Sequence, residues 1–128
     1  MIRFNVDKSD RILVVELSGI ISEEDIDGAI EQLQLQYPGV GVHLRGGDAG
    51  GFKMLADWQN LEGWEKGART LGTITLKTIG DAVRKVAVVA DAEFKDEEAR
   101  LADVAPTAVV RFFPSGQREA AQAWLRGD

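Results

Sequence analysis

The sequence contains no cysteine, one histidine and three prolines in 128 residues. Without cysteine the chain has no disulfide, no thiolate nucleophile and no Cys-based metal site, and this composition fits a protein of the cytoplasm. A single imidazole with no second imidazole or thiolate is a poor basis for a metal site. We therefore expect no metal and no cofactor, and we interpret His43 as a solvent-facing loop residue.

Long apolar runs and an excess of positive charge are also missing. No apolar run approaches the roughly 18 residues of a membrane span, and residues 1–10 have neither the basic start nor the apolar middle of a signal peptide, which again predicts a cytoplasmic protein. The formal net charge is −6. Because phosphate contacts need clustered Lys and Arg, we expect no nucleic-acid partner.

The composition that is present is that of an ordinary soluble domain. Hydrophobic residues make up 45% of the chain and charged residues 28%, which argues against disorder and fibrous structure. A chain of 128 residues buries about two-thirds of its unfolded surface around one core. We expect a single domain over residues 1–128.

Alternating apolar residues open the chain. Ile2, Phe4 and Val6 alternate with polar residues, which predicts a half-buried strand. The denser apolar run from Arg11 to Leu17 predicts its partner in an antiparallel hairpin.

A helix is expected next. Ser22 has a side chain suited to an N-cap, and the acidic residues that follow it favour the positive end of a helix dipole. Apolar residues at helical spacing predict a helix to about Gln36, and Pro38 ends it.

Six glycines lie in the segment from Gly39 to Gly51. The segment invites comparison with a phosphate-binding loop, but it follows a helix instead of a strand and lacks the third glycine and the lysine at the required positions. We predict a surface loop, with an anion site as the alternative.

The stretch FKMLADWQNLEGW, from Phe52 to Trp64, is the centre of the predicted fold. Its apolar run to Ala56 predicts a buried strand, which we expect to end at Asp57. Trp58 and Trp64 then bracket a polar turn. A strand that ends in a turn and leads to a helix places that turn at the carboxyl edge of a sheet, where open α/β folds usually bind ligands.

The segment from Glu65 to Gly80 has conflicting local preferences. Ala68 and Leu71 follow Trp64 at helical spacing, whereas β-branched residues favour a strand over Thr73 to Ile79 and glycines weaken a helix. We predict a helix, because neighbouring parallel strands need a crossover of a dozen or more residues. This helix would be weak and held mostly by packing.

The last third of the chain alternates strands and helices. A continuous apolar run from Val86 to Ala90 predicts a strand covered on both faces, and Asp91 ends it. The fold class is therefore α/β, with a mixed sheet that begins with an antiparallel hairpin and is covered by about four helices. The remaining expected elements are a helix over Phe94 to Asp103, a strand over Ala108 to Phe112, and a helix over Gln117 to Arg126 with Ala120, Ala121, Trp124 and Leu125 facing the sheet.

Four segments of the chain carry a resemblance to a known family. They are LADWQNLEGW (Leu55 to Trp64), RKVAVVAD (Arg84 to Asp91), VVRFF (Val109 to Phe113) and EAAQAWLRG (Glu119 to Gly127). These segments resemble the SpoIIAA-like family. The resemblance implies a STAS-like fold, the type found in sulfate transporters and anti-sigma factor antagonists, and a relation to CRAL-TRIO lipid-binding domains. Two features depart from the family: Phe94 stands near a position where a tryptophan is common, and the Gly39 to Gly51 loop is longer than usual.

The resemblance also bears on phosphorylation. Regulatory STAS domains carry an Asp-Ser pair at the start of the helix after the central strand, and that serine is phosphorylated. The corresponding stretch, Asn60 to Glu65, has no serine or threonine, so we expect no phosphoryl switch there. Thr70 and Thr73 lie further along and are interpreted as helix-surface residues.

Our first functional hypothesis is a non-enzymatic regulatory or ligand-binding domain. Its weak crossover helix would open over an apolar pocket for a lipid-like or other apolar small molecule, or would contact a membrane surface. The predicted ligand-binding residues are Trp58, Trp64, Ala68, Leu71 and Phe94. Ordinary core packing is the alternative role for these aromatic side chains.

Two alternative functions are consistent with the same predicted fold. The first is a homodimeric protein-interaction module with neither ligand nor phosphoryl switch. The second is an enzyme, in which Asp57 and Asp91 would meet at the carboxyl edge as a polar site for acid–base chemistry. Because no histidine, cysteine or nucleophilic serine stands beside them, we expect no enzyme and interpret both carboxylates as turn caps.

Overall fold

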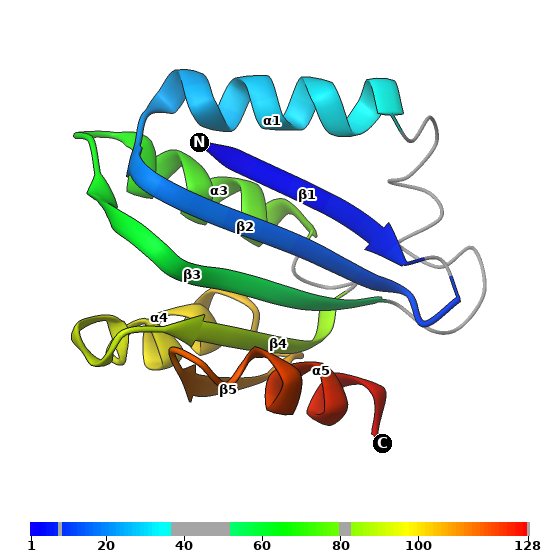
Figure 1. Ribbon diagram of the computed structural model, residues 1–128. Coiled ribbons are helices and arrows are strands. Elements are labelled where there is room, and N and C mark those ends of the chain that lie inside the picture. Colours follow the sequence, from blue (N-terminus) through cyan, green and yellow to red (C-terminus); the bar gives the residue numbers. More distant parts are fainter. Residues whose placement is uncertain (8, 37–51, 80–82, 128) are drawn as a thin grey trace.

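Within the described residues, five strands form one sheet in the order in which they occur along the chain. The computed structural model describes residues 1–7, 9–36, 52–79 and 83–127. β1 pairs with β2 in antiparallel orientation, and all later pairs are parallel (Figure 1), so the mixed sheet and the N-terminal hairpin are confirmed. The strands are β1 (Ile2–Asp7), β2 (Ile12–Ile21), β3 (Phe52–Trp64), β4 (Val83–Ala90) and β5 (Val109–Pro114).

The helices cover the two faces of the sheet unequally. Right-handed crossovers that proceed in one direction along a sheet place their helices on the same face. Accordingly α1, α3 and α4 lie on one face, whereas α5 covers the other (Figure 1). No described helix is long and apolar enough to cross a membrane. The helices are α1 (Glu23–Gln36), α3 (Ala68–Ile79), α4 (Glu97–Val104) and α5 (Arg118–Arg126), with a short 3-10 helix, η2 (Ala92–Phe94), before α4.

Successive residues of β4 point to opposite faces of the sheet. Val86, Val88 and Ala90 belong to the apolar cluster beneath α1, α3 and α4, and Ala87 and Val89 belong to the cluster beneath α5. All five are 0% exposed. The prediction of a strand covered on both faces is therefore confirmed.

The segment with conflicting local preferences is a helix. α3 connects the parallel strands β3 and β4, as the crossover rule requires. Gly67, immediately before it, has a φ of 88°, a conformation that a residue with a Cβ adopts only at a cost. The helix thus begins at Ala68, later than the Glu65 start that was expected.

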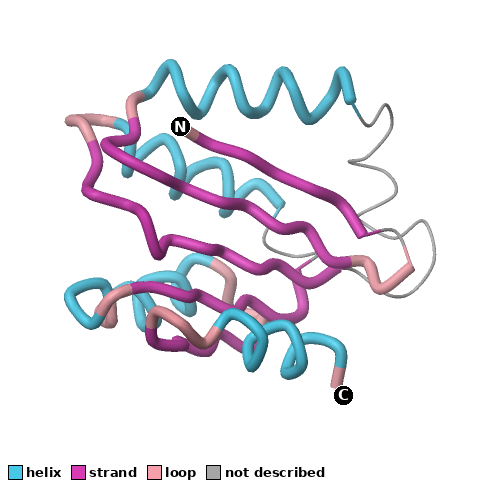
Figure 2. The backbone as a smooth tube through the Cα atoms, in the orientation of Figure 1, coloured by secondary structure: helices cyan, strands magenta, loops and turns pink. Residues whose placement is uncertain are grey.

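Strand β3 does not end at Asp57 but continues to Trp64, so the predicted turn is wrong. The pairing of β3 with β2 shifts after Asp57, and an extra residue enters β3. There the N–H of Gln59 donates to Asp57 Oδ1 at 3.1 Å, which pairs a backbone donor at the irregularity. Asp57 and Trp58 therefore lie inside a bent strand (Figure 2). The Asp57 carboxylate accepts a hydrogen bond at the bulge and does not mark the end of the strand.

Several boundaries in the last third also differ from the sequence-based expectation. The helix expected over Phe94 to Asp103 is divided into η2 and α4, and the last strand continues through Pro114. On α5, Ala120 is exposed while Ala121 and Leu125 are buried. The Gly39 to Gly51 segment and His43 lie outside the described residues.

The N-terminus of α1 is closed by a reciprocal pair of hydrogen bonds. The N–H of Asp25 donates to Ser22 Oγ at 3.1 Å, and the N–H of Ser22 donates to Asp25 Oδ2 at 2.9 Å. This is a capping box with aspartate in place of glutamate. The hydrogen bond from the Ser22 backbone is the main cause that lowers the pKa of Asp25.

The C-terminus of α5 is held by two lysines from the sheet. Lys53 Nζ donates to the carbonyl of Leu125 at 2.6 Å, and Lys85 Nζ donates to the carbonyl of Trp124 at 3.1 Å. Cations at the C-terminal end of a helix are favoured by the helix dipole. These contacts fix α5 across β3 and β4.

Candidate functional site

A cavity of about 220 Å³ lies between the sheet and helices α1 and α3. Three small residues face it from three different elements: Ala56 on β3, Ala29 on α1 and Gly72 on α3. Interiors normally pack with few voids larger than one water molecule. The cavity exists because the sequence places small side chains at facing positions where larger ones would fill the space.

The sheet side of the cavity is apolar and follows from strand periodicity. Residues that are partners across neighbouring strands point to the same face, as in the row formed by Phe4, Val15, Ala56 and Val88. Ala56 is the smallest member of this row. The residues of the three strands that line the cavity, apart from the tryptophans, are Ile2, Phe4, Leu13, Val15, Leu17, Met54 and Ala56.

Two tryptophans of β3 complete the sheet side. Trp58 and Trp64 both line the cavity, and their rings meet edge to face with centroids 5.7 Å apart. Phe94 packs against Trp58 from behind the cavity lining, with centroids 6.3 Å apart. The three predicted aromatic residues are thus neighbours, and two of them form the wall.

The other two predicted ligand-binding residues lie beside the cavity. Ala68 is buried in the apolar cluster, and Leu71 is a partly buried residue that packs against it. Neither belongs to the lining of the cavity. Both residues belong to α3, the helix that also carries Arg69, Gly72 and Thr73.

The lining becomes polar where α3 meets α4. Arg69, Thr73 and Arg100 all line the cavity. The buried carboxylate of Glu97 accepts from Arg69 Nη2 at 2.6 Å and also from Arg100 Nε. Arg100 Nη1 donates to Thr73 Oγ1, which itself donates to the carbonyl of Arg69 at 2.9 Å. Two guanidinium groups therefore share one carboxylate.

One donor of the cavity lining has no partner in the described part of the chain. Trp64 Nε1 is buried and makes no hydrogen bond. A buried donor left unpaired costs about 1–3 kcal/mol.

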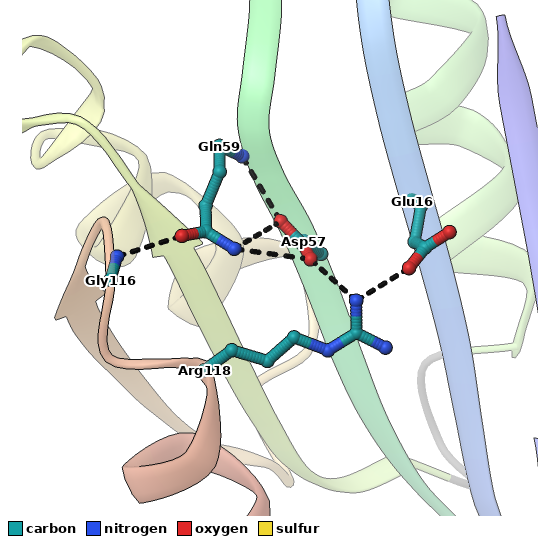
Figure 3. Close-up of polar contacts among 5 residues, drawn as sticks. All are labelled: Glu16, Asp57, Gln59, Gly116 and Arg118. Atoms are coloured by element: carbon teal, nitrogen blue, oxygen red, sulfur yellow. Dashed lines mark hydrogen bonds and ion pairs between the residues drawn. The ribbon is translucent and has the colours of Figure 1, made fainter.

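On the opposite face, Asp57 belongs to a polar cluster that attaches α5 to the sheet (Figure 3). Arg118, the first residue of α5, donates through Nη1 to Asp57 Oδ2 at 2.8 Å and to Glu16 Oε2 at 2.5 Å. Hydrogen bonding to Glu16 is the largest influence on the pKa of Arg118 and raises it. Gln59 Nε2 donates to Asp57, and Gln59 Oε1 accepts from the N–H of Gly116 at 2.7 Å. Every polar group of this cluster has a partner within the fold.

The two carboxylates of the predicted polar site have separate partners. Asp91 precedes η2 and accepts from Ser115 Oγ at 2.5 Å, whereas Asp57 is occupied by Gln59 and Arg118. Within residues 1–7, 9–36, 52–79 and 83–127, no hydrogen bond or ion pair joins Asp57 to Asp91, and no acidic or histidine cluster is arranged to hold a metal ion. Each carboxylate is thus bound to its own partners among the described residues.

The stretch from Asn60 to Glu65, which the resemblance compares with the STAS phosphoryl switch, does not lie at the start of a helix. Asn60 to Trp64 continue β3 and contain no hydroxyl residue. Thr70 is exposed on α3, and Thr73 is occupied by its hydrogen bonds to Arg69 and Arg100. Thr73 is therefore part of the cavity's polar end, where the sequence had suggested only helix surface.

Sequence reasoning missed the polar end of the cavity and the arginine of the opposite cluster. Glu97 and Arg100 are three residues apart on α4, a spacing from which their pairing could have been proposed. Arg69 is 28 residues from Glu97, and Arg118 is 61 from Asp57. No local pattern reports such distant pairings.

The fold and the site define a STAS-like α/β domain. A sequence model of the SpoIIAA-like family matches residues 12–126, and the chain belongs to this family. Among curated proteins, none matches the sequence. A crystal structure of an uncharacterised protein from Shewanella loihica PV-4, described as having a SpoIIAA-like fold, is similar: the TM-score is 0.71 at 19% identity, covering 98% of this chain and 92% of that one. This likeness supports the fold alone.

Proposed function

We propose that this domain is a non-enzymatic binding protein that holds a small apolar molecule in the cavity between β1–β3 and helices α1 and α3. The lining is apolar except at one end, and the cavity is partly open to the surface. A concave apolar site with a few polar groups suits a small molecule.

The observation that carries the proposal is the apolar lining of the cavity. This lining leaves apolar side chains next to space that water can enter. Removing apolar surface from water is favourable by roughly 25 cal/mol per Å². A molecule that fills the space covers these side chains, which gives the domain a thermodynamic reason to bind one.

Helix α3 is the wall that we propose moves to admit the molecule. It carries Gly72 and several threonines, which weaken a helix, and it follows Gly67, whose φ is 88°. Opening α3 would expose the side of the cavity that contains Arg69, Gly72 and Thr73.

The proposal is tested with 1-octanol, a neutral apolar probe. We expect it to bind the purified protein with a saturable change in tryptophan fluorescence, because Trp58 and Trp64 line the cavity. Ala56→Ile fills the space and should abolish binding. Ala120→Ile, an exposed position on α5, is the matched control and should leave binding unchanged.

Two outcomes would contradict the proposal. One is octanol binding that persists in Ala56→Ile, which would place the probe elsewhere. The other is no binding by the unaltered protein, and a dimer in light scattering would then support the alternative of a homodimeric interaction module.

A further inference from the structure

The charge on the cavity lining has one sign. Among the described lining residues, Arg69 and Arg100 carry charge and no aspartate or glutamate is present. Glu97, behind the lining, neutralises one of the two guanidinium groups. One positive charge therefore remains at this end, in a chain whose formal net charge is −6. In an apolar cleft, such an excess positive charge favours an anionic ligand.

Donor groups at the same end of the cavity point to a ligand that accepts hydrogen bonds. Arg69, whose side chain is 53% exposed, has donors beyond the one given to Glu97. Guanidinium groups donate only.

The size of the cavity limits the apolar part of the ligand. One water molecule occupies roughly 30 Å³ in the liquid. A cavity of about 220 Å³ therefore holds roughly seven groups of that size. A chain of about seven carbons fits this space.

We propose that the ligand is a medium-chain carboxylate, with its alkyl chain against Phe4, Val15 and Ala56 and its carboxylate between Arg69 and Arg100. This inference rests on the proposed function and adds the chemical class of the ligand. A carboxylate matches the fork geometry of guanidinium donors. The head group competes with Glu97 for the same donors.

The test compares three probes that have the same chain and different head groups: octanoate, 1-octanol and octylamine. Isothermal titration of the full chain should give a Kd for octanoate at least about tenfold below that for 1-octanol, because a hydrogen bond to a charged group adds about this much. Octylamine should bind more weakly than both. Equal affinity for octanoate and 1-octanol would overturn the inference and leave the proposed function standing. Failure of all three probes would overturn both.

Two substitutions with opposite expected effects locate the head group. Arg69→Gln should weaken octanoate about tenfold and leave 1-octanol unchanged, whereas Glu97→Gln removes the competing carboxylate and should tighten octanoate. Arg69→Lys retains the charge and should restore part of the preference. Arg84→Gln, an exposed position on β4, is the control for overall charge and should change neither affinity.

Thermal melting of each variant separates loss of binding from loss of folding. Folded Arg69→Gln protein that still prefers octanoate would overturn the inference, as would Glu97→Gln protein that binds octanoate more weakly than the unaltered chain. If Arg69→Gln does not fold, the Arg69→Lys and Glu97→Gln results decide.

Discussion

Two carboxylates are buried among the described residues, those of Asp57 and Glu97, and each is paired with arginine. Removing one partner of a buried ion pair leaves a charge without compensation, which is more costly than losing an exposed pair. The two carboxylates nevertheless have different settings. Asp57 is enclosed by partners within the fold, whereas Glu97 lies behind the lining of a cavity.

At this scale we predict that Arg118→Met lowers the free energy of unfolding by about 1–3 kcal/mol. The reason is that Asp57, only 7% exposed, loses its ion-pair partner. The value is below that of a fully buried pair because the Arg118 side chain is 34% exposed. Urea denaturation measures the change.

The control for this prediction is Arg126→Met. Arg126 pairs with Asp10, and their side chains are 51% and 45% exposed. Exposed pairs contribute about 0–1 kcal/mol. Equal losses in the two variants would mean that Asp57 is not buried as described.

At the scale of elements, the sequence predicts α3 correctly and β3 only in part. Local preference alone would have made Thr73 to Ile79 a strand, but the need for a crossover between parallel strands outweighs it. No comparable rule predicts that Asp57 lies inside a strand. Its side chain accepts from the N–H of Gln59, a hydrogen bond that depends on the bulge and leaves no periodic pattern.

Two glycines of this region should respond in opposite ways to the same substitution. Gly72→Ala should stabilise the protein by about 0.5–1 kcal/mol, because alanine favours a helix. The added Cβ would meet Ile26 Cδ1 at 3.7 Å, an ordinary contact. Gly67→Ala should destabilise by about 1–2 kcal/mol, since its φ is 88° and its Cβ would lie 2.5 Å from the Glu23 carboxylate.

Both glycine variants are measured by thermal and urea unfolding. The pair is informative because both sites are partly buried glycines at the start of one helix. If Gly67→Ala proved neutral, the chain would enter α3 by a different backbone path.

At the scale of the whole molecule, the sequence predicts the aromatic residues of the site better than it predicts the cavity. Trp58, Trp64 and Phe94 are neighbours, as expected near one edge of the sheet, although Trp58 lies inside β3 and not beyond its end. The cavity depends on which small residues face one another across three elements. That requires the register of the strands and the position of α1 and α3, and neither can be read from one sequence.

Because of the cavity, we predict that the same alanine-to-isoleucine substitution changes stability differently on the adjacent strands β3 and β4. Ala56→Ile points into the empty space and should leave stability unchanged or raise it. Ala87→Ile enters the packed opposite face beneath α5 and should cost about 1–3 kcal/mol. Both alanines are at most 4% exposed, so burial alone does not distinguish them.

Urea denaturation of the two alanine variants measures the difference. A loss in Ala56→Ile as large as that in Ala87→Ile would mean that the space beside Ala56 is already filled.

The unequal cover of the sheet has a consequence for synthesis. Leu55, Ala87 and Val89 are shielded from water by α5, the last described element to emerge from the ribosome. Until α5 docks, this face of the nascent sheet is an exposed apolar surface that can aggregate with other chains. A domain arranged in this way completes its folding only after α5 has been synthesised and has docked on this face.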